Sequence, residues 1–287
     1  MSEPLIQWYP GHIAKAEKQL ARNLEKVDLV IEVRDARIPK ATSHPHLNRW
    51  IKEKRHLLVI NRLDMISGEA QSSWQKYFEA QEKNCLWCNA KNGLGSKNIL
   101  ENAIQAGNEL NERRRSRGML NRPVRALVLG FPNVGKSALI NRLAGKKVVE
   151  SARRAGVTRT LRWIRMGHQL DLLDAPGVLP PRLEDQEAAL KLAICDDIGQ
   201  GAYESEIVAI RFLKMTFWDA NQTNKEISSS ALANRYGISF DKSNQSPYEW
   251  LVEASKLHTS GNTTRMAQRV LDDFRKTLLG PISLELP

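Results

Sequence analysis

Residues 130–137, GFPNVGKS, have the residue types and the spacing of a loop that binds phosphate groups. They fit the pattern G-x-x-x-x-G-K-[ST], follow the apolar run 124–130 and open the helical pattern 136–143. Glycines allow backbone N–H groups to approach phosphate oxygens, and a helix N-terminus adds partial positive charge. Lys136 would reach the β- and γ-phosphates of a nucleotide, and the hydroxyl of Ser137 would bind Mg²⁺. The nucleotide contacts predicted in this stretch are Asn133, Val134, Gly135, Lys136, Ser137 and Ala138.

A second motif, DAPG at 174–177, would complete the metal side of the phosphate site. Asp174 ends the apolar run LDLLD and would hold Mg²⁺, directly or through water, while the N–H of Gly177 would face the γ-phosphate. The stretch AGVTRT lies between the two motifs. Its Thr158 is the better candidate for a Mg²⁺-binding switch threonine, and Thr160 is the second.

The segment Asn61-Arg62-Leu63-Asp64 predicts that the base is guanine. It follows the apolar run HLLVIN and matches the motif N-K-x-D, except that arginine replaces lysine. The Asp64 carboxylate would accept hydrogen bonds from N1–H and the 2-amino group of guanine, a pair of donors that adenine lacks. The stem of Arg62 would cover the face of the base, as the lysine stem does.

A second base loop is Cys88-Asn89-Ala90-Lys91, which resembles the S-A-K loop whose alanine N–H contacts O6 of guanine. The predicted base contacts are therefore Asn61, Arg62, Asp64, Asn89 and Ala90. Cys85 and Cys88 form a C-x-x-C pair, but tetrahedral zinc needs two more ligands and no Cys or His pair stands nearby. Cys85 is better explained as a buried strand residue and Cys88 as part of the base loop.

The elements that must position these loops alternate along the first 180 residues. Near-continuous apolar runs, typical of strands covered on both faces, span 28–34, 56–61, 85–88, 124–130, 161–166 and 170–174. Helical patterns span 13–26, 68–83, 99–117 and 136–143. The alternation predicts an α/β fold, a mostly parallel sheet flanked by helices.

The chain after about Pro181 has a mainly helical pattern. In its clearest helix, apolar residues recur at a spacing of four: Met266, Val270, Phe274 and Leu278. Asn262 or Thr263 is the expected N-cap, and Gly280-Pro281 the stop. We place a domain boundary near residues 181–186.

Basic residues are concentrated in one part of the chain. Lys and Arg number 43 against 32 Asp and Glu, a net charge of +11. Fifteen of the basic residues lie between Arg113 and Arg165, where Glu150 is the only acid. Such a block favours a polyanionic partner such as nucleic acid, although charge cannot distinguish DNA from RNA.

The composition excludes several classes of protein. Hydrophobic residues make up 41% and charged residues 26%, which is ordinary for a globular protein. We find no apolar window long enough for a membrane span, no signal or transit peptide, and too few cysteines (three) for a disulfide framework. We therefore expect a cytoplasmic protein with no membrane partner, and by default a monomer.

The order of the motifs is unusual, because the base motifs precede the phosphate motifs, whereas Ras-like GTPases carry them in the opposite order. The same sheet can be built with moved termini when the original ends lie close together. This order is similar to that of circularly permuted GTPases. Together with WYPGHIAKA, DARIP at 35–39 and the late DDFRKTLLGPISLE, the motifs resemble the YlqF/RbgA family of ribosome-biogenesis GTPases over nearly the whole chain.

The resemblance implies a P-loop GTPase fold with a circularly permuted G domain over residues 1–182 and an all-helical domain over 183–287 that contacts RNA or the ribosome. It implies an enzyme that hydrolyses GTP, uses Mg²⁺ and assists assembly of the large ribosomal subunit. The partner of the basic block would then be ribosomal RNA rather than DNA. The alternative is an RNA-binding scaffold with a weakly active or regulatory nucleotide site, which Val178 and Arg62 favour and the intact phosphate motifs disfavour.

Val178 occupies the position where Ras-like enzymes place a glutamine that orients the attacking water. The sequence therefore predicts slow hydrolysis by the protein alone, stimulated by the ribosomal subunit. Asn133 matches the asparagine that related GTPases use to bind K⁺, which would neutralise developing charge. The resemblance suggests His12 as a residue that positions the water. Asn133 and His12 are therefore both candidate catalytic residues, in addition to Lys136.

Overall fold

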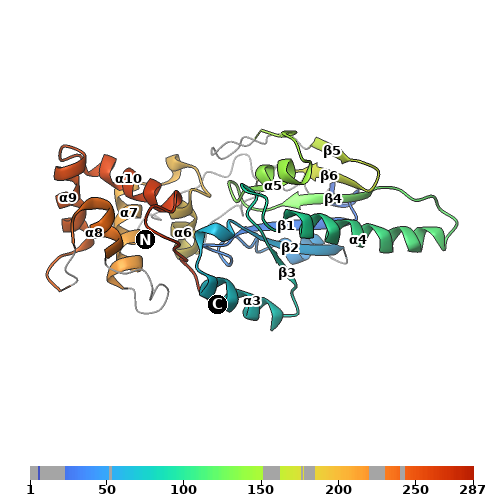
Figure 1. The fold of residues 1–287 in the computed structure, drawn as a ribbon, viewed down its shortest axis with the longest axis horizontal. Coiled ribbons are helices and arrows are strands. Elements are labelled where there is room, and N and C mark those ends of the chain that lie inside the picture. The colour runs from blue at the N-terminus through green and yellow to red at the C-terminus, as the bar shows by residue number, and fades with distance from the viewer. Residues whose placement is uncertain are drawn as a thin grey trace.

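The computed structural model describes residues 6, 23–51, 54–150, 162–175, 177, 185–219, 230–239 and 243–287. In these residues a six-stranded sheet flanked by helices is joined to a helical C-terminal region (Figure 1). The strands are β1 (Leu29–Asp35), β2 (Arg55–Asn61), β3 (Cys85–Trp87), β4 (Val124–Leu129), β5 (Arg162–Met166) and β6 (Leu170–Asp174). The predicted α/β fold is confirmed.

The strand order is β3-β2-β1-β4-β6-β5, and every neighbouring pair is parallel except β5 with β6. The chain builds the sheet outward from β1 through β2 to β3, then returns to start β4 on the other side of β1. The point where the direction reverses therefore lies between β1 and β4. In open parallel sheets, ligands bind at the carboxyl ends of the strands beside such a point.

The middle of the sheet explains the long apolar runs in the sequence. All seven residues of β1 are buried, because strands pair with both of its edges and side chains cover both of its faces. The polar residues within β1 are paired: Arg34 Nε lies 2.6 Å from Glu32 Oε1, and His56 Nε2 on β2 lies 2.9 Å from Glu32 Oε2.

Helices cover both faces of the sheet. The sheet-flanking helices are α2 (Leu47–Ile51), α3 (Gly68–Glu79), α4 (Ser96–Arg115) and α5 (Lys136–Leu143), and η2 (Leu63–Met65) is a short 3₁₀ turn. Helices α4 and α5 share a core with one set of alternate strand residues, which includes Ile31 and Val128. Residues of α2 pack with the opposite set, which includes Val30 and Leu127.

The C-terminal region is helical, as predicted. It comprises α6 (Gln186–Cys195), η3 (Gln200–Ala202), α7 (Ser205–Leu213), η4 (Lys214–Trp218), α8 (Ser230–Tyr236), α9 (Pro247–His258) and α10 (Thr263–Arg275). The boundary predicted near 181–186 falls mostly outside the described residues, as does most of the helix predicted over 13–26.

Helix α10 confirms most of its prediction. Asn262 caps it by accepting a hydrogen bond from the Arg265 N–H, and its apolar face is buried. The inclusion of Leu278 and the stop at Gly280-Pro281 were wrong, because the helix ends at Arg275 and Leu278 is half exposed. The chain turns at Thr277, whose φ is 60°, and the Leu278 N–H returns to the Asp273 carbonyl.

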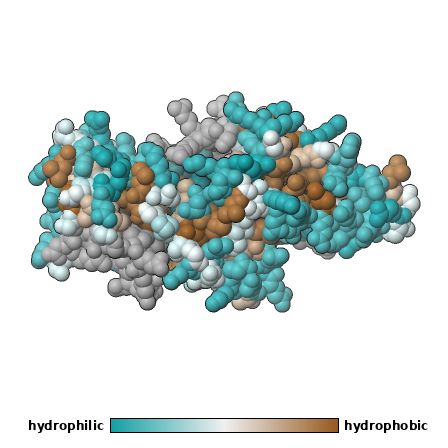
Figure 2. Space-filling view, viewed as in Figure 1, coloured by the Kyte–Doolittle hydropathy of each residue, from teal (hydrophilic) through white to brown (hydrophobic). Residues whose placement is uncertain are grey.

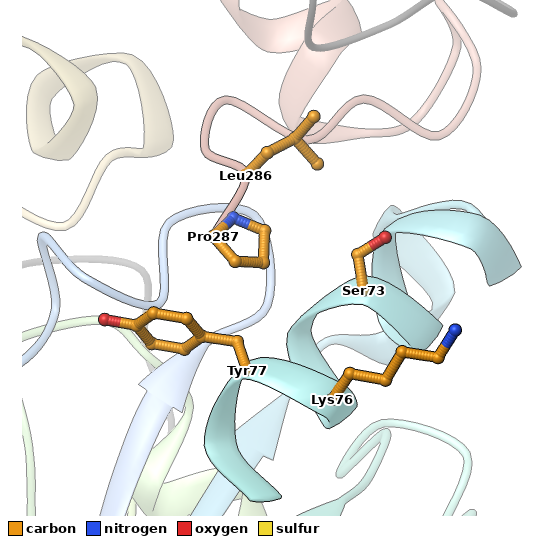
Figure 3. Close-up of a pocket in the computed structure, with 5 residues that line it drawn as sticks. All are labelled: Ser73, Lys76, Tyr77, Leu286 and Pro287. Atoms are coloured by element: carbon orange, nitrogen blue, oxygen red, sulfur yellow. The ribbon is translucent and has the colours of Figure 1, made fainter. Parts of the chain in front are cut away.

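The last residues of the chain tie the helical region to the sheet. The Leu284 N–H donates to the Arg37 carbonyl, and the Glu285 carboxylate accepts from the Lys40 N–H at 2.7 Å. Figure 3 shows Leu286 and Pro287 beside Tyr77 of α3, around an open pocket of about 610 Å³. In the described part of the chain, no helix has the length and apolar character needed to cross a membrane.

Candidate functional site

The phosphate loop connects β4 to α5, so it lies at the carboxyl edge of the sheet beside the reversal point. Lys136, the first residue of α5, is buried and folds back over the loop. Its Nζ donates to the Gly130 carbonyl at 3.1 Å and to the Phe131 carbonyl at 2.7 Å. Burial lowers the pKa of Lys136 to about 8, and Asp174 and Asp197 act in the opposite direction. The loop thus holds an ammonium group where a phosphate would need one.

Asn61 joins the base motifs to the phosphate loop. Its Nδ2 donates to the Val134 carbonyl at 2.8 Å, and its Oδ1 accepts from the Ala90 N–H at 3.0 Å. Gly135 has a φ of 99°, and a Cβ there would lie 2.2 Å from Asn61 Nδ2. The close approach of β2 to the phosphate loop therefore requires glycine at 135.

The second base loop is held by its own side chain. Asn89 Oδ1 accepts from the N–H groups of Lys91 and Asn92, at 2.9 and 3.3 Å. Cys88 is buried and its thiol donates to Asn61 Oδ1 at 3.4 Å. In this structure the Ala90 N–H, predicted to contact O6 of guanine, is bonded to Asn61, so its contact with a base stays a prediction.

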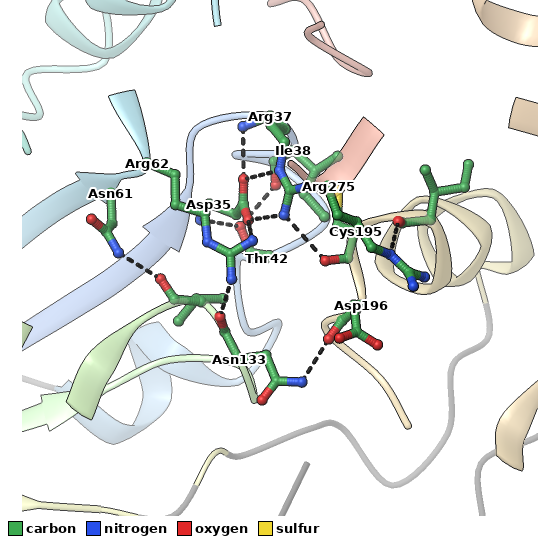
Figure 4. Close-up of polar contacts among 12 residues, drawn as sticks. Asp35, Arg37, Ile38, Thr42, Asn61, Arg62, Asn133, Cys195, Asp196 and Arg275 are labelled. Atoms are coloured by element: carbon green, nitrogen blue, oxygen red, sulfur yellow. Dashed lines mark hydrogen bonds and ion pairs between the residues drawn. The ribbon is translucent and has the colours of Figure 1, made fainter. Parts of the chain in front are cut away.

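Asp64 and Arg62 lie on the same loop but differ in their surroundings. Asp64 is exposed, at the middle of η2, where a base could reach its carboxylate. The guanidinium of Arg62 points to the phosphate loop instead of lying free (Figure 4). Its Nη2 donates to the Asn133 carbonyl, and its Nη1 lies 3.2 Å from Asp35 Oδ2. The head group of Arg62 therefore joins its own loop to the phosphate loop and to the end of β1, a role that the sequence did not predict.

Replacing Arg62 with lysine is expected to lower the free energy of unfolding by about 1 kcal/mol, because one ammonium cannot hold both partners of a guanidinium fork. Urea unfolding would measure this. The matched control is Arg55→Lys, because Arg55 pairs with Glu109 on the exposed surface, where an ion pair contributes little. Equal losses in the two variants would contradict a bridging role for Arg62.

The motif at 174–177 reaches the same place from β6. Asp174 pairs in register with Val128 of β4 and is buried. Its Oδ1 has no hydrogen-bond partner in the described residues, and burial raises its pKa while Lys136 opposes the rise. Gly177 packs on the phosphate loop, since a Cβ there would lie 2.7 Å from Pro132 Cα.

The remaining predicted residues divide into two groups. Ser137 and Ala138, on the first turn of α5, are half-buried at the mouth of the loop. His12, Thr158, Thr160 and Val178 lie outside the described residues, so their predicted roles stay predictions.

The helical region also touches the phosphate loop, which the sequence did not predict (Figure 4). The Asn133 Nδ2 donates to the Asp196 carbonyl at 2.6 Å. Arg37 donates to the neighbouring Cys195 carbonyl at 3.1 Å and forms a two-point ion pair with Asp35. Asp35 also faces Arg62, so the contacts close into a ring that joins both parts of the molecule.

Asp197 lies beside this ring. It is fully buried, neither carboxylate oxygen has a hydrogen-bond partner among the described residues, and burial raises its pKa to about 8.

The sequence signal that could have revealed the ring of contacts is the segment DARIP at 35–39. Its charged residues come at the end of a buried strand, at the reversal point of the sheet.

Known proteins match this chain along nearly its whole length. A family described as 50S ribosome-binding GTPase matches residues 125–216. A ribosome biogenesis GTPase A from Bacillus licheniformis is 32% identical over 286 residues, covering 99% of both chains. Another, from Priestia megaterium, is 38% identical over 210 residues, covering 73% of both. The chain belongs to the ribosome biogenesis GTPase A family.

The protein is therefore a GTPase that binds GTP and GDP and hydrolyses GTP in ribosome biogenesis, and the resemblance to the YlqF/RbgA family is confirmed. A crystal structure of YlqF from T. maritima, solved with GNP bound, has the same fold. Its TM-score is 0.64 at 23% identity, and the alignment covers 95% of this chain and 98% of that one. The circularly permuted order of the motifs along this chain is the order that this fold carries.

Proposed function

We propose that the GTPase is a nucleotide-dependent assembly factor for the large ribosomal subunit. In the GTP state it binds ribosomal RNA of the precursor subunit, and hydrolysis releases it. The observation that carries the proposal is the meeting of both base loops with the phosphate loop at Asn61, which couples recognition of guanine to the phosphates. The basic block and the names of the relatives support the ribosomal partner.

The residues present fit a Mg²⁺ ion. Asp174 offers a buried carboxylate oxygen without a hydrogen-bond partner in the described residues, and Ser137 supplies a hydroxyl in the first turn of α5. Thr158 would be the third protein group. When bound, the ion neutralises negative charge on the β- and γ-phosphates.

Asn133 is the proposed K⁺ ligand. Because its amide nitrogen donates to the Asp196 carbonyl, its amide oxygen must point the other way, and that oxygen is the atom a cation would take. K⁺ in this position supplies positive charge to the transition state. We propose that either K⁺ or His12 takes the role of the glutamine whose position Val178 occupies, and that the ribosomal subunit stimulates hydrolysis.

The proposal predicts tight binding to precursor large subunits only with a triphosphate. The protein would be co-sedimented with precursor and mature subunits under GDP, GTP or a non-hydrolysable analogue, in K⁺ buffer at fixed salt, and the series repeated in Na⁺. Equal binding to precursor subunits in all nucleotide states, or binding to unrelated RNA as tight as binding to the subunit, would contradict the switch. A monomeric state and a cytoplasmic location remain predictions.

A further inference from the structure

Helix α4 extends beyond the part that packs on the sheet. Its buried residues end at Gly107, where a Cβ would lie 2.8 Å from Val124 Cβ. None of the residues 108–121 is buried, and Figure 1 shows this end of α4 and the following loop projecting from the sheet. We call residues 108–122 the arm. Two hydrogen bonds between Asn111 and the backbone of Arg122 brace its base.

The arm carries positive charge at its far end. Arg113, Arg115 and Arg117 are exposed, and among the described residues none has an ion-pair partner. Arg114 instead donates to the Leu120 carbonyl at 3.0 Å and shapes the turn. Figure 2 shows a hydrophilic surface over this part of the molecule, with a small hydrophobic area at its far end. Leu120, in the turn after α4, is 87% exposed.

An exposed aromatic ring lies on the neighbouring strands. Trp163 on the edge strand β5 is 40% exposed, and the guanidinium carbon of Arg125 lies 5.8 Å from its ring centroid. Arg125 stands on β4 three residues after Arg122, which ends the arm. Arg125 and Trp163 lie on the face of the sheet opposite α4, because they alternate with Val124 and Ile164, which share a core with that helix. The arm projects past the amino end of β4, so an RNA that follows this end of the sheet would meet both.

We propose that the arm and the Arg125–Trp163 pair form a docking surface for structured RNA, with the arginines on phosphates and Trp163 stacked on an unpaired base. The proposal rests on the proposed function, since it names where that RNA binds. Arginines without acidic partners supply charge complementarity to a phosphate backbone. A flat exposed indole beside a guanidinium provides a stacking surface for nucleic-acid bases. An acidic peptide has no bases to stack there, so the indole favours RNA as the partner.

The arm lies far from the nucleotide. Helix α4 starts just after the second base loop and runs away from it for 20 residues, which is about 30 Å. None of the arm's residues contributes to the ring around Asn133. The arm therefore supplies RNA affinity that is the same with GDP and with GTP.

The test compares the triple variant R113Q/R115Q/R117Q with K76Q/K83Q/K97Q, which removes the same charge from other exposed positions of the sheet domain. Glutamine keeps the helix propensity of α4. The probe is an RNA hairpin with an unpaired loop, bound by the full chain with GDP and with a non-hydrolysable GTP analogue. We expect the arm variant to lose at least about tenfold in affinity in both states, and to lower the slope of log K against log salt by about 2–3. Its GTP hydrolysis without RNA should stay unchanged.

Trp163→Ala is expected to weaken hairpin binding about fivefold or more, and Trp163→Phe to retain most of it. If the arm variant binds the hairpin as well as its control, or if the wild type binds polyglutamate as tightly as RNA, the docking surface is refuted. The proposed switch fails separately, when wild-type binding to precursor subunits does not differ between GDP and the analogue.

Discussion

Replacing Lys136 with alanine lowers the affinity for GTP by roughly 100- to 10,000-fold, because two charge-assisted hydrogen bonds to phosphate oxygens are lost, each worth about 1.5–3 kcal/mol. Its ammonium group is already desolvated inside the loop, bonded to the Gly130 and Phe131 carbonyls. Part of the free-energy cost of removing this ammonium group from water is therefore incurred on folding, before the nucleotide binds. Equilibrium binding of a fluorescent GTP analogue measures the loss, and GTP turnover falls with it.

The control for Lys136→Ala is Lys146→Ala, which removes an exposed lysine beyond the end of α5 and should change neither the affinity for GTP nor the turnover.

Lys136→Ala also distinguishes the switch from the scaffold. A switch loses the nucleotide dependence of its ribosome binding with Lys136, whereas a scaffold keeps its RNA affinity and its role in the cell. A Lys136→Ala protein that supports subunit assembly normally would therefore favour the scaffold.

The sequence predicted the loops of this site because their chemistry is local. Gly135 and Gly177 are needed where backbones approach closely, and such requirements leave a readable spacing in the chain. The strands were equally predictable, since a strand covered on both faces, such as β4, forms a nearly continuous apolar run in the sequence.

The contacts of the longer side chains could not be predicted. Arg62 was expected to cover the base, yet its guanidinium reaches Asn133 of the phosphate loop and Asp35 at the end of β1. The Asn133–Asp196 contact joins segments 63 residues apart and depends on how the helical region docks. Its acceptor is a backbone carbonyl, which leaves no trace in residue type. Sequence patterns thus identified which groups meet the nucleotide, but not which groups hold them in place.

Asp64→Asn tests the identity of the base. Guanine offers two donors, N1–H and the 2-amino group, to the carboxylate, whereas xanthine has a carbonyl oxygen in place of the amino group. Asparagine supplies one acceptor and one donor, so the variant should bind xanthosine triphosphate in preference to GTP. Because an unpaired polar group in a closed site is costly, we expect the ratio of the two affinities to change by roughly 100-fold or more.

The structure makes this change easy to interpret. Asp64 is exposed at the middle of η2, so its replacement should alter the free energy of unfolding by no more than about 0.5 kcal/mol. Glu69→Gln removes an exposed acid near the start of α3 and controls for charge alone. Competition between GTP and xanthosine triphosphate measures the preference directly. If Asp64→Asn and Glu69→Gln show the same preference as the wild type, the base is read by another group, and the loop at Asn61 serves only to hold Val134 and Ala90 together.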